Sequence, residues 1–186
     1  MIETLQKKKI KNKISVKKKR EVTEKITHQV IQIKRVSKVV KGGKKLSFRA
    51  VVVVGVNSIK GLVGIGVGKA DDVTNAINKA ISKGKKNLIQ IPITKNNSIT
   101  HSVIGIYGAC NVVIKPSTSG SGVIAGSSIR TVLEVAGVRN VLSKQIGSNN
   151  LLNSARATIE GLKNLKTITQ VAKERDVAVD SLYRTT

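Results

Sequence analysis

The stretch that decides the fold of this chain is VVKGGKKLSF, residues 39–48. It separates two runs rich in β-branched residues, one over residues 30–40 and the other over residues 46–56. A glycine pair between such runs predicts a β-hairpin, because glycine adopts the positive φ that tight turns need. Three lysines surround the glycine pair, so the hairpin is expected to end in a projecting basic finger that an anionic partner would grip.

The net charge indicates a polyanionic partner. Across 186 residues the chain has 34 Lys and Arg against 10 Asp and Glu, a net charge of +24. Self-repulsion of this size disfavours the compact state of an isolated chain, and a bound nucleic acid relieves it. Residues 1–86 hold 23 of the basic residues and 5 of the acidic ones, so the front half carries most of the positive charge.

The aromatic content narrows the kind of nucleic acid. Proteins that read single-stranded bases usually stack them on aromatic side chains. This chain has one Phe, two Tyr and no Trp, which is too few for such a platform. Contact with phosphates, and with the shape of folded or double-stranded nucleic acid, is therefore expected.

The front of the chain is expected to form a basic arm followed by a small domain. Residues 1–24 are rich in lysine without a steady apolar period, which predicts a disordered arm that orders on a polyanion. A plain solubility tail is the alternative. Residues 25–87 predict three strands and a helix, with a turn at residues 57–58 and a third strand over residues 61–68.

The helix of this first domain has start and stop signals. Asp71 or Asp72 can cap its beginning, and its last turn is expected over residues 83–86, where cations suit the helix dipole and glycine suits the stop. Its apolar face is expected to comprise Val73, Ile77, Ala80 and Ile81.

A second domain is expected over residues 88–166. Two strands (99–106 and 109–115) lead through a Gly/Ser segment to a helix that starts at residues 126–128 and ends at Gly137. A strand over residues 140–146 and a helix over residues 151–162 complete the domain. Residues 167–186 predict a C-terminal tail with a short helix. The expected fold class is α+β, and two cores this small should support each other.

Two glycine-rich segments could suggest an enzyme. GIGVGK, residues 64–69, lacks the earlier glycine and the following Ser or Thr of a phosphate-binding loop, so its glycines are interpreted as strand positions for close backbone approach. The Gly/Ser segment within residues 116–128 precedes a helix N-terminus, where anions bind. An ordinary capped helix, an RNA or protein contact, and a phosphotransferase site all stay open there, although no acidic pair accompanies the segment.

The remaining chemistry is sparse. His28, His101 and Cys110 have no metal-ligand spacing, so neither a metal nor a cofactor is expected. No apolar run approaches the ~20 residues of a membrane span, so no membrane partner is expected, and neither is a small-molecule substrate. The start resembles neither a secretory signal nor a transit peptide, which predicts that the protein works in the compartment where it is made.

The residues also resemble a known family. The string RVSKVVKGGKKLSF, residues 35–48, is very similar to small-subunit ribosomal protein five. The resemblance continues through residues 64–70, 120–126, 130–138 and 147–150, and it covers roughly residues 25–180. Residues 39–49 and the segment around Lys144 look most like the cyanobacterial and plastid branch.

This resemblance implies a fold and a role. The first domain would be like a double-stranded-RNA-binding domain without its first helix, and the second would be a βαβ-type α/β domain. The protein would be a structural part of the small ribosomal subunit, not an enzyme. It would bind rRNA near the decoding region and the side where mRNA enters, and it would support subunit assembly and translational fidelity. A free binding protein for double-stranded or structured RNA, or an RNA chaperone outside the ribosome, is the alternative.

The resemblance also implies partners and a location. The partners would be small-subunit rRNA and small-subunit ribosomal proteins four and eight, with mRNA at the channel as a further contact left open. The location would be the ribosome of a chloroplast or other plastid stroma, with the bacterial cytoplasm as the alternative.

The candidate contact residues follow from charge and from the resemblance. Gly42 and Gly43 would let the finger tip approach RNA closely. The positions that match the family's contact with protein four are Gly120, Gly122 and Arg130. The side chains expected to neutralise rRNA phosphates are Arg35, Lys38, Lys41, Lys44, Lys45, Lys60, Lys69, Lys83, Lys85, Lys86 and Lys115.

Overall fold

The computed structural model describes residues 26–56 and 59–183. The expected arm at residues 1–24 and the expected turn at residues 57–58 lie outside the described residues. The chain is α+β, as the sequence predicts, and it has two four-stranded sheets. The first unit comprises β1 (Ile26–Val40), β2 (Gly43–Val56), β3 (Leu62–Ala70), α2 (Val73–Lys86) and β4 (Ile89–Gln90).

The first sheet has the order β1-β2-β3-β4 and is antiparallel throughout. Its three long strands and one helix confirm the prediction for this domain. The two-residue strand β4 is an addition, because Ile89 and Gln90 pair with the start of β3 before the chain crosses into the second unit.

Helix α2 packs on one face of the first sheet at backbone distance. A Cβ placed on Gly66 would lie 1.9 Å from the carbonyl oxygen of Ala80, and one on Gly68 would lie 2.0 Å from that of Ala76. Only glycine permits this approach, which confirms the interpretation of the GIGVGK glycines as close-contact strand positions.

The ends of α2 lie where the sequence predicts, with the last turn at Lys83–Lys86. Gly84, however, is a buried member of the contact face, where its Cβ position would lie 2.6 Å from Val54 Cγ2. This glycine therefore serves packing and not termination. Asp72 is the N-cap residue, but its carboxylate accepts from the Asn75 side chain at 3.1 Å instead of capping the helix.

The residues predicted for the apolar face of α2 do face the sheet, but most of them are not the most buried residues of the helix. Ala80 is fully buried, as expected, whereas Val73, Ile77 and Ile81 are half-buried. The most buried neighbours of Ala80 are the small residues Ala76 and Gly84, because the close approach to β3 leaves room for nothing larger.

The second unit contains a βαβ motif, as the family resemblance implies. Its sheet has the order β5-β6-β8-β7. Strands β7 and β8 are parallel neighbours, and α3 connects them in the chain. Strand β7, which has only two residues, was not predicted. The first strand of the unit begins at Val103 and not at residue 99. The elements are β5 (Val103–Tyr107), β6 (Cys110–Pro116), β7 (Val123–Ile124), α3 (Ser127–Ala136), β8 (Val141–Gly147) and α4 (Leu151–Lys163).

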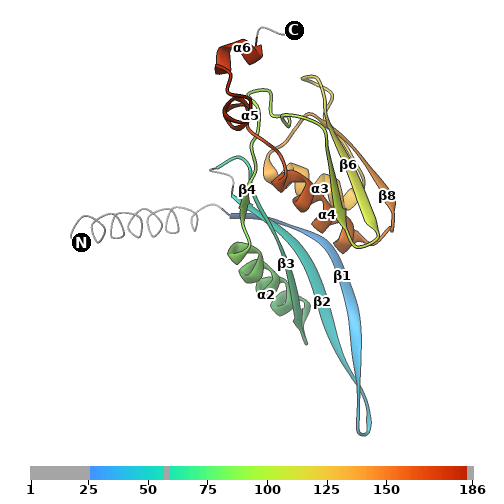
Figure 1. Ribbon diagram of the computed structural model, residues 1–186. Coiled ribbons are helices and arrows are strands. Elements are labelled where there is room, and N and C mark those ends of the chain that lie inside the picture. The colour runs from blue at the N-terminus through green and yellow to red at the C-terminus, as the bar shows by residue number, and fades with distance from the viewer. Residues whose placement is uncertain (1–25, 57–58, 184–186) are drawn as a thin grey trace, which may run out of the picture.

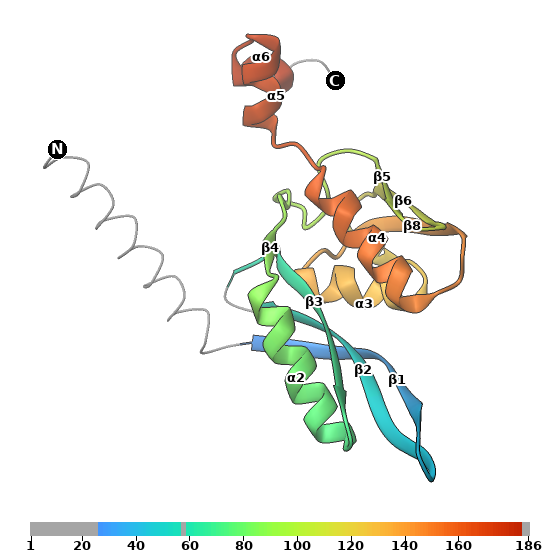
Figure 2. The ribbon, with the colours of Figure 1, turned by 60° about the horizontal axis from the view of Figure 1, so that its bottom comes forward.

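The C-terminal segment forms two short helices where one was expected. They are α5 (Ile168–Arg175) and α6 (Val179–Tyr183). A capping box starts α5: Thr167 Oγ1 accepts from the backbone N–H of Gln170, and the Gln170 side chain accepts from the backbone N–H of Thr167. Figures 1 and 2 show both helices standing away from the two sheets.

Helices α3 and α4 lie between the two sheets, and the two units share one core (Figures 1 and 2). Val53 and Val63 of the first sheet pack in the same buried cluster as Leu133 of α3, Leu162 of α4 and Ile114 of the second sheet. Burying each such side chain stabilises the fold by about 1.5–3 kcal/mol. The expected mutual support of the two units is thus a continuous apolar core, and the boundary predicted at residues 87–88 stays a prediction.

The predicted hairpin projects beyond the rest of the first sheet. β3 pairs with β2 only from Phe48 to Gly55, so the β1–β2 pairs further out have no third strand. We call this two-stranded extension, residues 36–47, the finger. Figure 1 shows it reaching away from the body of the molecule.

Candidate RNA-binding interface

The tip of the finger is a two-residue turn. Val40 pairs with Gly43, which leaves Lys41 and Gly42 as the loop. Gly42 has φ +91° and Gly43 has φ +149°, values that L side chains rarely adopt, and a Cβ on either would have no neighbour within 4 Å. The glycines are therefore required by the backbone, and the space around the tip is open to a partner.

The strand register sorts the cations of the finger and its base onto two faces. Residues directly opposite each other in an antiparallel pair point to the same face. Lys38 is opposite Lys45, and four residues along the chain Lys34 is opposite Arg49, which is itself opposite Lys69 of β3. We call these five residues the cationic face, and its three-strand part, Lys34, Arg49 and Lys69, the cationic row.

The cationic face holds like charges at close range. Side chains directly opposite each other have Cβ atoms about 4.5–5.5 Å apart, and like charges there destabilise the sheet. Within the described residues, the acidic contact of this face is Asp71, 3.7 Å from Lys45 Nζ, and both side chains are well exposed. An exposed pair of this kind contributes little. The face thus carries positive charge that a bound polyanion would neutralise.

The opposite face of the finger and its base mixes cations with exposed apolar side chains. Arg35 is opposite Phe48, and Lys44 is opposite Val39, which is 75% exposed. Leu46, 47% exposed, shares this face. The sequence-predicted contacts Arg35 and Lys44 therefore point away from Lys38 and Lys45.

Sequence reasoning missed two members of the cationic face, Lys34 and Arg49. The signal was present, because alternation along β2 puts Arg49 on the same side as Val51 and Val53. The hairpin register then pairs Arg49 with Lys34. The prediction of the finger considered only the residues near its tip. It did not follow the alternation of side chains along the two strands toward the base, where Lys34 and Arg49 lie.

The other predicted phosphate contacts lie in separate places. Lys60 is at the far end of the first sheet from the finger, where its Nζ donates to Asn97 Oδ1 at 2.9 Å. Lys83, Lys85 and Lys86 are exposed in the last turn of α2. Lys115 is exposed on β6 of the second sheet. Of the predicted residues, the structure brings Lys38, Lys45 and Lys69 onto one face, and it leaves these five apart.

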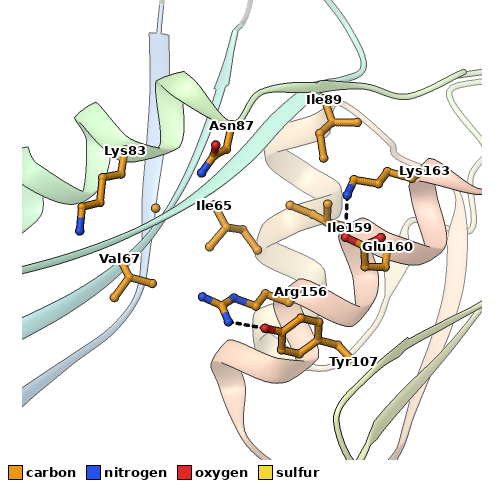
Figure 3. Close-up of a pocket in the computed structure, with 11 residues that line it drawn as sticks. Ile65, Val67, Lys83, Asn87, Ile89, Tyr107, Arg156, Ile159, Glu160 and Lys163 are labelled. Atoms are coloured by element: carbon orange, nitrogen blue, oxygen red, sulfur yellow. Dashed lines mark hydrogen bonds and ion pairs between the residues drawn. The ribbon is translucent and has the colours of Figure 1, made fainter.

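A groove of about 400 Å³ lies between the first sheet and α4 (Figure 3). Ile65 and Val67 of β3 line it, and Lys69 follows on the same face of that strand. Arg156 Nη1 donates to the Tyr107 hydroxyl at 2.6 Å, and its guanidinium carbon lies 5.1 Å from the ring centroid.

Further charged groups of the groove come from α2 and α4. Lys83 of α2 and Lys163 of α4 line it, and Lys163 Nζ donates to Glu160 Oε1 at 2.6 Å. The only acid among the lining residues is therefore already paired, and the groove offers cations but no free carboxylate to act as a base.

The residues predicted to contact a protein partner lie around the start of α3. The backbone N–H of Gly120 donates to Asn140 Oδ1 at 3.1 Å, and the carbonyl of Gly122 accepts from the N–H of Val141 at 3.1 Å. Arg130 forms an ion pair with Glu134, 2.7 Å between Nε and Oε1. The three predicted residues are exposed. The N-cap of α3 is Gly126, which supplies no side-chain cap.

The described residues give no support for metal or acid–base chemistry. Among them, no group of three or more His, Cys, Asp or Glu could hold a metal ion. Cys110 is fully buried in the shared core. The His101 ring bridges the carbonyl of Ser102 and the backbone N–H of Lys166, which is a structural role. In the part of the chain that the structure covers, no helix has the length and apolar character to span a membrane.

Comparison with known proteins places this architecture in a family. The family described as ribosomal protein S5, N-terminal domain, matches residues 26–92, and ribosomal protein S5, C-terminal domain, matches residues 105–175.

Individual relatives agree with both matches. A protein of Trieres chinensis named small ribosomal subunit protein uS5c is 63% identical over 157 residues, covering 84% of each chain. The uS5 protein of Synechocystis sp. is 60% identical over 155 residues, which is 83% of this chain and 88% of the relative. The uS5c protein of Pyropia yezoensis is 56% identical over 157 residues, 84% of this chain and 89% of the relative. The chain therefore belongs to the ribosomal protein S5 family, a family of structural proteins and not of enzymes.

Proposed function

We propose that this chain is a structural constituent of the small ribosomal subunit and that it holds rRNA through the finger and the cationic row. The observation that carries the proposal is the register: Lys38 opposite Lys45, and Lys34 opposite Arg49 opposite Lys69, all on one face. Cross-strand like charges cost stability in the free chain and favour binding to phosphates. The names of the relatives support the same role.

The proposed mechanism is architectural. The cationic face runs along two long strands whose base is anchored in the shared core, so its charges are held at a fixed spacing. Over the four residues between Lys45 and Arg49, a strand covers about 13 Å, enough to engage several phosphates of folded RNA. The opposite face presents Arg35 and Lys44 beside apolar side chains, so the finger can lie between two RNA segments and fix their relative position. Such a contact would support subunit assembly and decoding accuracy.

Further contacts of the finger base are part of the proposal. Lys83, Lys85 and Lys86 at the end of α2 would extend the phosphate contacts, and the tip would lie near the decoding region and the side where mRNA enters. Lys60 would add a contact at the opposite end of the first sheet. Direct contact with mRNA stays a proposal of the same kind.

Protein partners and location are also proposals. Small-subunit proteins four and eight are the proposed neighbours, with Gly120, Gly122 and Arg130 facing protein four. The exposure of all three residues supports this. The plastid stroma is the proposed location, supported by the uS5c names of two relatives, and the bacterial cytoplasm is the alternative because Synechocystis sp. has an equally similar protein.

Sedimentation tests the function. An epitope-tagged chain is expected to co-migrate with small subunits and to stay with them after a high-salt wash, because it is held by many contacts at once. A loosely bound RNA chaperone would leave the subunit at high salt and appear in the light fractions, and that profile would overturn the proposal. ATP turnover by the purified chain would revive a phosphotransferase, which family membership does not favour.

A further inference from the structure

The groove between the first sheet and α4 combines an apolar lining with cations (Figure 3). Ile65 and Val67 of β3 are half-buried, and Ile159 of α4 also lines the groove. Lys83 of α2 and Arg156 of α4 supply positive charge. A volume of about 400 Å³ is in the range of pockets that hold one small ligand, so the groove admits a single nucleotide but not a double helix.

Arg156 is held in this groove by a neutral partner. Its Nη1 donates to the Tyr107 hydroxyl at 2.6 Å, and its guanidinium carbon lies 5.1 Å from the centroid of that ring. Glu160 is four residues further along α4, a spacing at which arginine and glutamate often pair, yet it binds Lys163. The phenol therefore orients the guanidinium without neutralising its charge. Guanidinium planes and tyrosine rings are surfaces on which RNA-binding proteins stack unpaired bases.

The groove continues into the cationic row. Ile65, Val67 and Lys69 alternate along β3, so they lie on one face of the first sheet, each about 7 Å from the next. On that face Lys69 is opposite Arg49. An RNA backbone held by the cationic row would therefore pass the mouth of the groove, where an unpaired nucleotide is within reach of its lining.

The chemistry of the groove favours a nucleotide over other occupants. The lysine-rich residues 1–24 have the same charge as the lining, which disfavours the chain's own arm. A peptide with acidic residues would match the charge, but it would compete with the RNA at the mouth of the groove. A nucleotide matches both parts of the lining. Its flat base fits between Ile65 and the Arg156–Tyr107 pair, and its phosphate is attracted by Lys83.

We propose that the groove binds one unpaired nucleotide of RNA, with its base on the Arg156–Tyr107 pair and its phosphate at Lys83. The inference deepens the proposed function and rests on it, because the cationic row holds the RNA beside the groove. One tyrosine is too little for a platform that reads a run of bases, but it is enough for a single base. The groove thus distinguishes an interrupted RNA helix from a regular one, which phosphate contacts alone do not do.

Binding to two matched RNA hairpins tests the inference. One hairpin has a continuous stem, and the other has the same stem with one unpaired 2-aminopurine, a fluorescent base whose emission reports its stacking. The full chain is expected to bind the interrupted stem about tenfold more tightly at moderate salt and to change its emission. Equal affinity for the two stems overturns the inference alone and leaves the proposed function in place. If the chain binds neither stem, the proposed function fails first and this inference fails with it.

Substitutions assign the preference to the groove. Arg156→Gln and Tyr107→Leu each remove one member of the pair, and the tenfold preference should fall to about twofold or less. Arg156→Lys keeps the charge and loses the plane, so the preference should fall there too. Arg175→Gln is the matched control, because it removes one charge from an exposed position of α5 and should keep the preference. A preference that survives both Tyr107→Leu and Arg156→Lys overturns the inference.

Crosslinking in assembled subunits separates RNA from a peptide as the occupant. Asn87→Cys places a thiol at an exposed position of the groove. A benzophenone maleimide labels it, since the natural Cys110 is buried and is not expected to react. The expected product joins residue 87 to rRNA, and a product with a subunit protein, or no product, overturns the inference. The same label at Val177→Cys, which is 43% exposed and outside the groove, is the control and should not give that product.

Discussion

The glycines of the finger and the glycines of β3 occupy neighbouring strands and meet opposite surroundings. Gly42 and Gly43 have positive φ and open space around them, whereas Gly66 and Gly68 have extended backbone and the carbonyl oxygens of α2 against them. The first pair is needed for the shape of a turn whose exterior is free. The second pair is needed because another part of the same chain occupies the space. The same residue type therefore marks an open turn in one region and a close contact within the chain in the other.

The largest expected effect comes from disrupting the close contact between β3 and α2. Gly66→Ala places a methyl group 1.9 Å from the Ala80 carbonyl oxygen, so α2 has to shift. We expect a loss of about 3 kcal/mol in the free energy of unfolding, measured by denaturation of the full chain. Gly126→Ala is the matched control, because its Cβ would meet only Ile129 Cδ1 at 4.0 Å. Equal losses for the two variants would show that α2 does not pack on β3 at backbone distance.

A substitution at the finger tip should affect rRNA binding more than stability. Gly43→Val adds a side chain where the chain itself offers no neighbour, so we expect a turn-strain cost of about 1 kcal/mol in unfolding. Affinity for small-subunit rRNA should fall about tenfold, because the tip can no longer approach the RNA backbone. Filter binding measures this loss. Ser37→Val adds the same side chain elsewhere on the finger, and a loss as large as that of Gly43→Val would contradict a special role for the tip.

A smaller effect sharpens the comparison at the base of the finger. Arg49→Gln removes the central charge of the cationic row, and we expect a several-fold loss of rRNA affinity at moderate salt, measured by filter binding. Lys144→Gln removes one charge from β8 of the second sheet and should leave rRNA affinity nearly unchanged. Similar losses for both would mean that total charge, and not the arrangement on the first sheet, determines binding.

The smallest effect has opposite signs in two measurements. Lys38→Gln relieves the repulsion with Lys45, so the free chain should become more stable by about 0.3 kcal/mol. The same change should weaken rRNA binding. Denaturation and filter binding on one preparation test both signs, and a loss of stability would show that Lys38 has a stabilising contact in the free chain.

The sequence predicted the secondary elements well where local signals were strong. The glycine pair and the β-branched runs on either side of it predicted the finger, and the signals at residues 126–128 and at Gly137 predicted the start and end of α3. The last turn of α2 was predicted at the right place, but the role given to Gly84 was wrong, because glycine is a stop signal in sequence, whereas Gly84 is a packing residue in three dimensions. That distinction depends on Val54, thirty residues away, and no local pattern contains it.

Composition predicted which residues could bind RNA, and only the strand register shows on which face of the sheet each of them lies. Charge alone identified the finger lysines, but it could not separate Lys38 and Lys45 from Lys44, which points to the other face. Arg49 was accessible to an alternation argument once the hairpin was assumed. The single core that the two units share could not be predicted in detail, because it depends on which faces of the two sheets α3 and α4 cover.

The salt dependence of rRNA binding tests the central claim most directly. For the full chain with small-subunit rRNA, the logarithm of the binding constant should fall steeply with the logarithm of salt concentration. Each neutralised phosphate contributes about 0.7–0.9 to the slope. The double variant Lys38→Gln/Lys45→Gln should bind more weakly, with a slope shallower by about 1.5. A shallow slope for the natural chain, or an unchanged slope for the double variant, would contradict the account that the cationic face of the finger holds rRNA.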